Sequence, residues 1–125
     1  MNASSSAHRG YAANAQTTQT GRRAEYALIA KVTHRLRATA QTADLHYSDY
    51  AQALHDNRTL WSTLAIDVAD ADNELPETLR ARIFYLSEFT TQHTTKILRE
   101  KASVMPLLEI NMAVLRGLKN EGARI

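Results

Sequence analysis

Side chains that can ligate a metal are spread along this chain of 125 residues. Four of its five histidines lie at positions 34, 46, 55 and 93. These spacings contain no H-E-x-x-H motif and no pair of histidines four residues apart, so no zinc site is predicted. His93 falls on the apolar face of an expected helix, where we interpret it as a core histidine with a hydrogen-bond partner.

A second group that could do chemistry is the acidic cluster Asp67, Asp70, Asp72 and Glu74. Its residue types are those of a cation-binding loop, but it lacks the glycine at the sharp turn and the terminal glutamate of an EF-hand. Side chains of Asp and Asn commonly bond nearby backbone N–H groups in turns. We therefore expect this segment to be a turn that also caps the following helix.

Covalent catalysis has little support in the residue types. The chain contains no cysteine and only four glycines. A G-x-S-x-G nucleophile motif and a glycine-rich phosphate loop are both missing from the sequence. The sequence thus predicts a non-enzymatic protein with no cofactor and no small-molecule substrate.

The charges are distributed in blocks. Residues 1–43 carry six basic and one acidic side chain, and residues 44–77 carry one basic and eight acidic side chains. Residues 78–125 carry eight basic and four acidic side chains. Neighbouring helices of opposite sign would attract each other, which is our preferred interpretation; a polarised surface for a partner is the alternative. The first helix is basic but offers no aromatic residues interleaved for base stacking, so direct binding of nucleic acid is disfavoured.

Hydrophobic spacing predicts four helices, near residues 22–42, 48–70, 76–100 and 106–119. The second is the clearest, because its apolar positions from Tyr50 to Val68 alternate in steps of four and three. Ser48 is its expected N-cap, while Pro76 and Pro106 suit helix starts and Ser103 is a cap candidate. Short links between long helices favour a small antiparallel all-α bundle.

The chain is short enough for one domain, which we place at residues 21–125. Residues 1–20 are rich in Ser, Ala, Thr, Asn and Gln and are predicted to form a flexible segment. That segment shows no apolar stretch of the kind a secretion signal has, and no apolar run is long enough to span a bilayer. We therefore expect a cytoplasmic protein that does not enter a membrane.

Trp61, the only tryptophan, lies on the apolar stripe of the second helix together with one polar residue, Asn57. A tryptophan in such a stripe is usually a core residue, and its indole N–H then needs a hydrogen-bond partner. Partial exposure in a binding groove is the alternative.

The central part of the chain resembles the flagellar biosynthesis regulator FlaF family, with weaker similarity over residues 11–118. The resemblance is carried by Leu54-x-x-Asn57-Arg58-x-Leu60-Trp61-x-x-Leu64-x-x-Asp67 and by Asn73-x-Leu75-Pro76-x-x-Leu79-Arg80. The residues that we take as the family motif are Asn57, Arg58, Trp61, Asp67, Asn73 and Pro76. A further short match is Leu108-x-x-Asn111.

The resemblance implies a cytoplasmic regulator of flagellum biogenesis, similar in role to flagellin export chaperones, that acts with the partner regulator FlbT. Two hypotheses follow. The first is a chaperone or adaptor that binds flagellin and supports its synthesis and secretion. The alternative is an RNA-associated regulator of the flagellin messenger acting with FlbT.

Client contacts are expected on the third and fourth helices, where apolar surface extends beyond one stripe. The candidate contact residues are Phe84, Phe89, Leu115 and Leu118. The sequence leaves open which flagellin is bound, which surface binds it and what the oligomeric state is.

Overall fold

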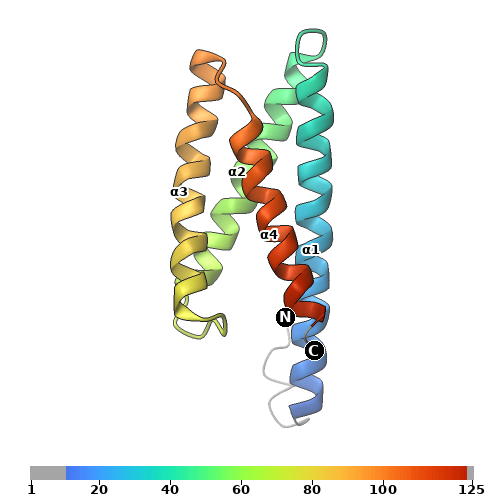
Figure 1. The fold of residues 1–125 in the computed structure, drawn as a ribbon, viewed down its shortest axis with the longest axis vertical. Helices are drawn as coiled ribbons and strands as arrows, with labels where there is room; N and C mark the ends of the chain where they lie inside the picture. The colour runs from blue at the N-terminus through green and yellow to red at the C-terminus, as the bar shows by residue number, and fades with distance from the viewer. Residues whose placement is uncertain (1–10, 124–125) are drawn as a thin grey trace.

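The computed structural model describes the backbone of residues 11–123 and the side chains of residues 23–117. Over this range the chain forms four helices and no strand: α1 (Tyr11–Gln41), α2 (Tyr47–Ala69), α3 (Glu77–Glu100) and α4 (Met105–Ala123). The predicted small all-α bundle is therefore confirmed (Figure 1). The expectation of flexibility in residues 1–10 lies outside the described residues.

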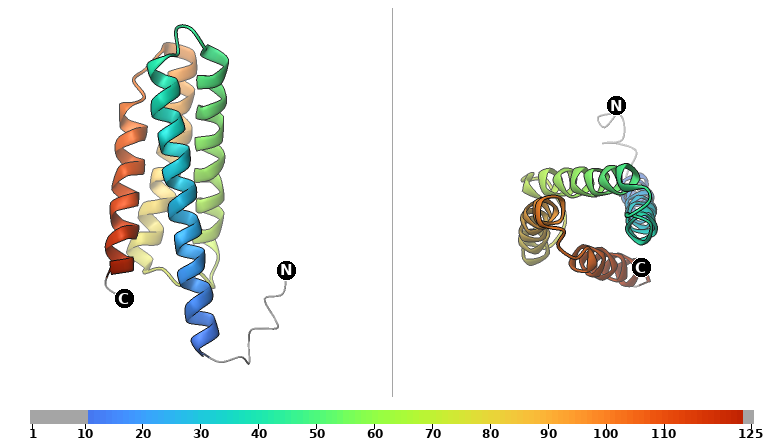
Figure 2. Two further views of the ribbon diagram at one scale, coloured as in Figure 1. Left: turned by 90° about the vertical axis from the view of Figure 1, so that its right-hand side faces the viewer. Right: turned by 90° about the horizontal axis from the view of Figure 1, so that it is seen from above.

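Consecutive helices run antiparallel because the connections at residues 42–46, 70–76 and 101–104 are short. Helix α2 packs against both α1 and α3, and α4 packs against α1, whereas α3 and α4 meet in few places. Seen from above, α2 and α4 lie on opposite sides of the bundle, with α1 and α3 at opposite corners (Figure 2). The first turns of α1 project beyond the other three helices.

Helix α1 begins at Tyr11 and not near Arg22, so its prediction was wrong by about three turns. The segment from Tyr11 to Gly21 contains no proline and three alanines. Adding residues to an existing helix costs much less than nucleating a new one. The regular helix that starts the bundle therefore continues through a segment that has no apolar stripe of its own.

The other helix ends lie within one or two residues of the predicted positions, apart from the end of α4, but two caps differ. Helix α2 is preceded by His46 and not by Ser48, because the His46 N–H already donates to the Thr42 carbonyl at 2.9 Å and so starts the turn. Pro76 occupies the N-cap of α3 with ψ 144°, and α3 has no side-chain cap. The prediction that the acidic cluster caps α3 was therefore wrong.

The connection from α3 to α4 is fixed at both ends. Lys101 ends α3 in the left-handed conformation with φ 56°, and its N–H donates to the Ile97 carbonyl at 3.1 Å. Ser103 Oγ accepts from the Met105 N–H at 3.1 Å, which confirms Ser103 as a cap of α4. This turn sets the slope at which α4 crosses toward α1 (Figure 1).

The apolar core has two parts. The first is built around Leu36, Leu54, Ile97, Leu107 and Leu108 at the end of the bundle that holds the α1–α2 and α3–α4 turns. The second lies further along α4 and consists of Ile29, Leu60 and Leu115. Both parts join α1, α2 and α4, and α3 contributes to the first part through Ile97.

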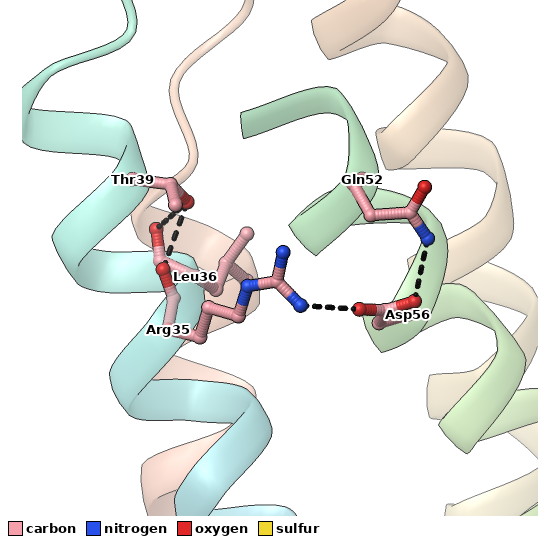
Figure 3. Close-up of polar contacts among 5 residues, drawn as sticks. All are labelled: Arg35, Leu36, Thr39, Gln52 and Asp56. Atoms are coloured by element: carbon pink, nitrogen blue, oxygen red, sulfur yellow. Dashed lines mark hydrogen bonds and ion pairs between the residues drawn. The ribbon is translucent and has the colours of Figure 1, made fainter. Parts of the chain in front are cut away.

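Among the described side chains, the charge pattern of the sequence gives an ion pair between α1 and α2. Arg35 Nη1 lies 3.0 Å from Asp56 Oδ2, and Gln52 Nε2 donates to the other carboxylate oxygen at 2.9 Å (Figure 3). The two charged side chains are 50% and 37% exposed, so the pair contributes only about 0.2–1 kcal/mol. The expected attraction between the basic first helix and the acidic second helix is present but weak.

Candidate functional site

The potential metal ligands singled out in the sequence do not converge. Among residues 23–117, whose side chains are described, no group of three or more His, Cys, Asp or Glu side chains could hold a metal ion. His93 is half-buried; its Nε2 lies 2.7 Å from the Ser103 carbonyl oxygen, and its ring stacks on Phe89 with centroids 5.5 Å apart. It is therefore a partnered histidine beside the core, as its position predicted.

The acidic segment after α2 is a turn held by its own side chains. Asp70 Oδ1 accepts from the Asp72 N–H at 2.9 Å, and Asn73 Oδ1 accepts from the Leu75 N–H at 3.0 Å. Asn73 Nδ2 donates to the Asp67 carbonyl at 3.0 Å. These are the local bonds expected of Asx turns, so the prediction that this segment is a turn is confirmed.

Arg80 of α3 ties this turn to the end of α2. Its Nε donates to the Val68 carbonyl at 2.9 Å and its Nη2 to the Asp70 carbonyl at 3.1 Å. The last carbonyls of a helix lack partners within the helix and carry partial negative charge, so a guanidinium suits them well.

The interior of the bundle holds a polar network centred on Asn111 of α4. Asn111 Oδ1 accepts from the indole N–H of Trp61 at 2.9 Å, and its Nδ2 donates to Thr33 Oγ1 at 3.0 Å and to Asn57 Oδ1 at 2.8 Å. The Thr33 hydroxyl donates in turn to the Ile29 carbonyl at 2.6 Å. All four side chains are at most 3% exposed, so the network joins α1, α2 and α4 in a region without water contact.

The chemistry of these groups allows one arrangement. An indole N–H can only donate, so the Asn111 oxygen must face Trp61 and its nitrogen must face Thr33 and Asn57. The Asn57 oxygen must then face Asn111, which leaves the Asn57 Nδ2 group without a protein partner. Both polar atoms of the Asn111 side chain therefore have partners, whereas Asn57 Nδ2 has none.

Helix α3 joins this region through a short polar row of its own. The Ser87 hydroxyl donates to the Trp61 carbonyl at 3.0 Å, and the Thr94 hydroxyl donates to the Thr90 carbonyl at 2.7 Å. All three α3 side chains are buried, and the Thr90 hydroxyl has no partner in the structure. Buried Ser and Thr, rather than large apolar residues, thus make up part of the face that α3 turns toward α2.

Among the side chains that the structure describes, two surface grooves can be followed. One lies between α1 and α4, has a volume of about 550 Å³, and is lined by Arg37, Leu108 and Met112 among others. The second lies between α2 and α3, has a volume of about 440 Å³, and includes Ile66 and Phe84.

Comparison with known protein families gives the chain a family. The family model described as flagellar protein FlaF matches residues 7–118. The chain belongs to the FlaF family. Comparisons with curated proteins and with solved structures gave no match. Membership of this family assigns the chain a role in flagellar biogenesis.

The residues that we took as the family motif have different positions in the bundle. Asn57 and Trp61 are fully buried in the polar network, so the prediction that Trp61 is a core residue is confirmed. Arg58 is half-buried on α2, and Asp67 lies near the end of the same helix. Asn73 lies in the turn between α2 and α3, and Pro76 is the N-cap of α3.

Sequence reasoning did not find the partner of Trp61. Asn111 lies 50 positions further along the chain and had been noted only in a short family match. The available signal was that Asn111, like Asn57, interrupts the apolar stripe of its helix. Two such amides in one small bundle can satisfy each other, because each carries both a donor and an acceptor.

The four predicted client contacts have different environments. Phe84 is 47% exposed and lines the α2–α3 groove, whereas Phe89 is half-buried against the first part of the core. Leu115 is 8% exposed and belongs to the second part of the core. The side chain of Leu118 lies outside the described residues. Phe84 alone of the three described side chains presents a large accessible surface.

The described helices also bear on the membrane prediction. None of those within residues 11–123 combines the length and the apolar content that crossing a bilayer requires.

Proposed function

We propose that this protein is a non-enzymatic chaperone or adaptor that binds flagellin in the cytoplasm and supports its synthesis and secretion. The observation that carries the proposal is the FlaF family match over residues 7–118, which covers all the described side chains. An all-α bundle with open grooves between neighbouring helices supports a binding role. Such grooves commonly receive an amphipathic helix of a partner through apolar side chains spaced at three and four residues.

The polar network gives the bundle a defined interior on which such a surface can rest. Three helices are held in one register by Asn111, since sliding α4 by a residue would break its bonds to Trp61, Thr33 and Asn57 together. Buried polar groups can specify register in helical assemblies. The groove between α1 and α4 therefore has a fixed shape before a client arrives, which lowers the cost of ordering the site on binding.

Titration of purified flagellin into this protein by calorimetry tests the proposal. Burial of apolar surface should give a negative heat-capacity change across a series of temperatures. Binding with these properties would support a direct chaperone. The absence of binding at tens of micromolar, equivalent to about −6 kcal/mol, would defeat it.

The RNA-associated alternative is favoured by one observation: Arg23, Lys31 and Arg37 of α1 are all exposed. A complex with the flagellin messenger would dissociate steeply as salt is raised, because phosphate contacts release counterions. Binding to the messenger at low salt, together with no binding to flagellin, would promote this alternative or an adaptor role with FlbT. A flagellin complex that persists in salt would support the chaperone.

A further inference from the structure

The groove between α1 and α4 has an apolar floor that continues the core to the surface. Leu108 is a buried member of the first part of the core, and Met112 packs against the second part. Met105, at the start of α4, is 54% exposed and extends the same side of the helix. Methionine side chains are flexible and adapt to varied apolar partners.

The length of this floor matches a short helix. Met105, Leu108 and Met112 are spaced at i, i+3 and i+7, so they form a strip along one side of α4. From Met105 to Arg116 the helix rises about 16 Å at 1.5 Å per residue, which corresponds to about three turns. An apolar stripe of three or four residues on a partner helix would cover it.

Two arginines lie at the borders of the apolar strip. Arg37 belongs to α1 and Arg116 to α4, and both are exposed. Neither forms an ion pair with any residue whose side chain is described, in contrast to Arg35, which is bound to Asp56 on the side of α1 that faces α2 (Figure 3). Glu109 is the single acid of the groove. The groove therefore combines an apolar floor with two available guanidinium groups.

The second groove differs from the first in its charge. It offers the exposed apolar side chains Ile66 and Phe84, but its charged lining consists of Glu88, with no basic side chain. An amphipathic helix with acidic borders would therefore find no positive charge there.

We propose that the α1–α4 groove is the docking site for an amphipathic helix of the client whose apolar stripe covers Leu108 and Met112 and whose border carboxylates meet Arg37 and Arg116. The inference rests on the proposed function, because the client helix is taken to belong to flagellin. Guanidinium–carboxylate pairs at the rim would fix the register and direction of the helix and speed its association.

The test compares two charge reversals with the same change in net charge. One is Arg37→Glu with Arg116→Glu, and the matched control is Arg82→Glu with Arg99→Glu on α3, where both arginines are also exposed. Flagellin binding to each variant and to the unmodified full chain is measured by calorimetry. Circular dichroism and thermal melting check that each variant is folded.

The expected result is that the groove reversal weakens flagellin binding at least tenfold, while the α3 reversal changes it less than threefold. A third variant, Phe84→Ala with Ile66→Ala, should leave the affinity within threefold. Equal loss in both reversals would mean that only overall charge matters and would overturn the inference. Loss confined to the Phe84 and Ile66 variant would also overturn it and assign the client to the α2–α3 groove.

These outcomes separate the inference from the proposed function. If flagellin binds the unmodified chain and the groove reversal equally well, the groove is not the docking site, but the chaperone function remains. If flagellin fails to bind the unmodified chain at all, the proposed function fails and the docking inference fails with it.

Discussion

Replacement of Asn111 by alanine should destabilise the bundle far more than replacement of Asn57 by alanine, although both amides are completely buried. The difference follows from their bonding. Asn111→Ala leaves the Trp61 N–H and the Asn57 oxygen without partners, while Thr33 keeps its bond to the Ile29 carbonyl.

The magnitude can be worked from these contacts. Each buried polar group left without a partner costs about 1–3 kcal/mol, so Asn111→Ala should cost roughly 2–6 kcal/mol. Asn57→Ala leaves a single N–H of Asn111 without a partner. It also removes the Asn57 Nδ2 group, which has no partner. Its cost should therefore be about 1–2 kcal/mol, since a single bond is lost and an unsatisfied donor is removed.

Urea unfolding measures both free energies. Trp61, as the only tryptophan, reports by fluorescence from inside the network, and far-ultraviolet circular dichroism reports the helices independently. Coincident transitions would justify a two-state treatment. A suitable control is Thr63→Ala, which removes an exposed hydroxyl bond to the Thr59 carbonyl and should change stability by less than about 0.5 kcal/mol.

A double-mutant cycle isolates the bond between the indole and the amide. Trp61→Phe removes the N–H that donates to Asn111. The loss of unfolding free energy in the double variant, Trp61→Phe with Asn111→Ala, should therefore be smaller than the sum of the two single losses by about 0.5–3 kcal/mol. The reasoning would be refuted if Asn57→Ala proved as destabilising as Asn111→Ala. It would also be refuted if the cycle showed independent effects.

Three other substitutions test the termini and the core. Arg80→Met should destabilise by about 1–3 kcal/mol in urea unfolding, because the Val68 carbonyl at the end of α2 loses a charged donor; no change would mean that water replaces the guanidinium. Lys101→Gly should raise stability by up to about 1 kcal/mol and so raise the melting temperature, because glycine occupies the left-handed conformation without cost; a lower melting temperature would contradict this. Burial, with a smaller effect of Tyr47, raises the pKa of Tyr50, so the folded state favours the neutral phenol. That stabilisation is complete below the usual tyrosine pKa near 10 and is lost as the pH rises through the raised pKa. The melting temperature of the Tyr50→Phe variant should therefore fall less steeply above about pH 10 than that of the unmodified protein. Equal slopes of melting temperature against pH for the two proteins would refute this.

The sequence predicted the helices because their signal is local. The apolar stripe from Tyr50 to Val68 repeats at the helical period, and prolines mark the starts of α3 and α4. The start of α1 was missed because residues 11–21 carry no stripe, so propagation from the following helix decides their conformation. Ser48 was wrongly chosen as a cap because the turn from Thr42 already sets the first bonds of α2.

The candidate sites depend on which helices become neighbours, and periodicity does not contain that information. The sequence placed Trp61 in the core but could not pair it with Asn111, since the pairing requires α2 and α4 to face each other at one level. The same applies to the α1–α4 groove, whose lining comes from residues 37–41 and 104–116. Arg37 and Arg116 become neighbours of one apolar strip only when α4 crosses toward α1.

The positions of the family-motif residues bear on the proposed recognition of a client. Trp61 and Asn57 are at most 1% exposed, so a client could touch them only if the bundle opened. Under the proposed function, their effect on binding would pass through the shape of α4, which Asn111 connects to them. Arg37 and Met105, by contrast, lie outside the motif and are exposed at the groove. Because Arg37 and Met105 are exposed and belong to neither part of the core, they are free, under the proposed docking, to determine which helix is accepted. Substitutions in the motif should instead lower stability and binding together.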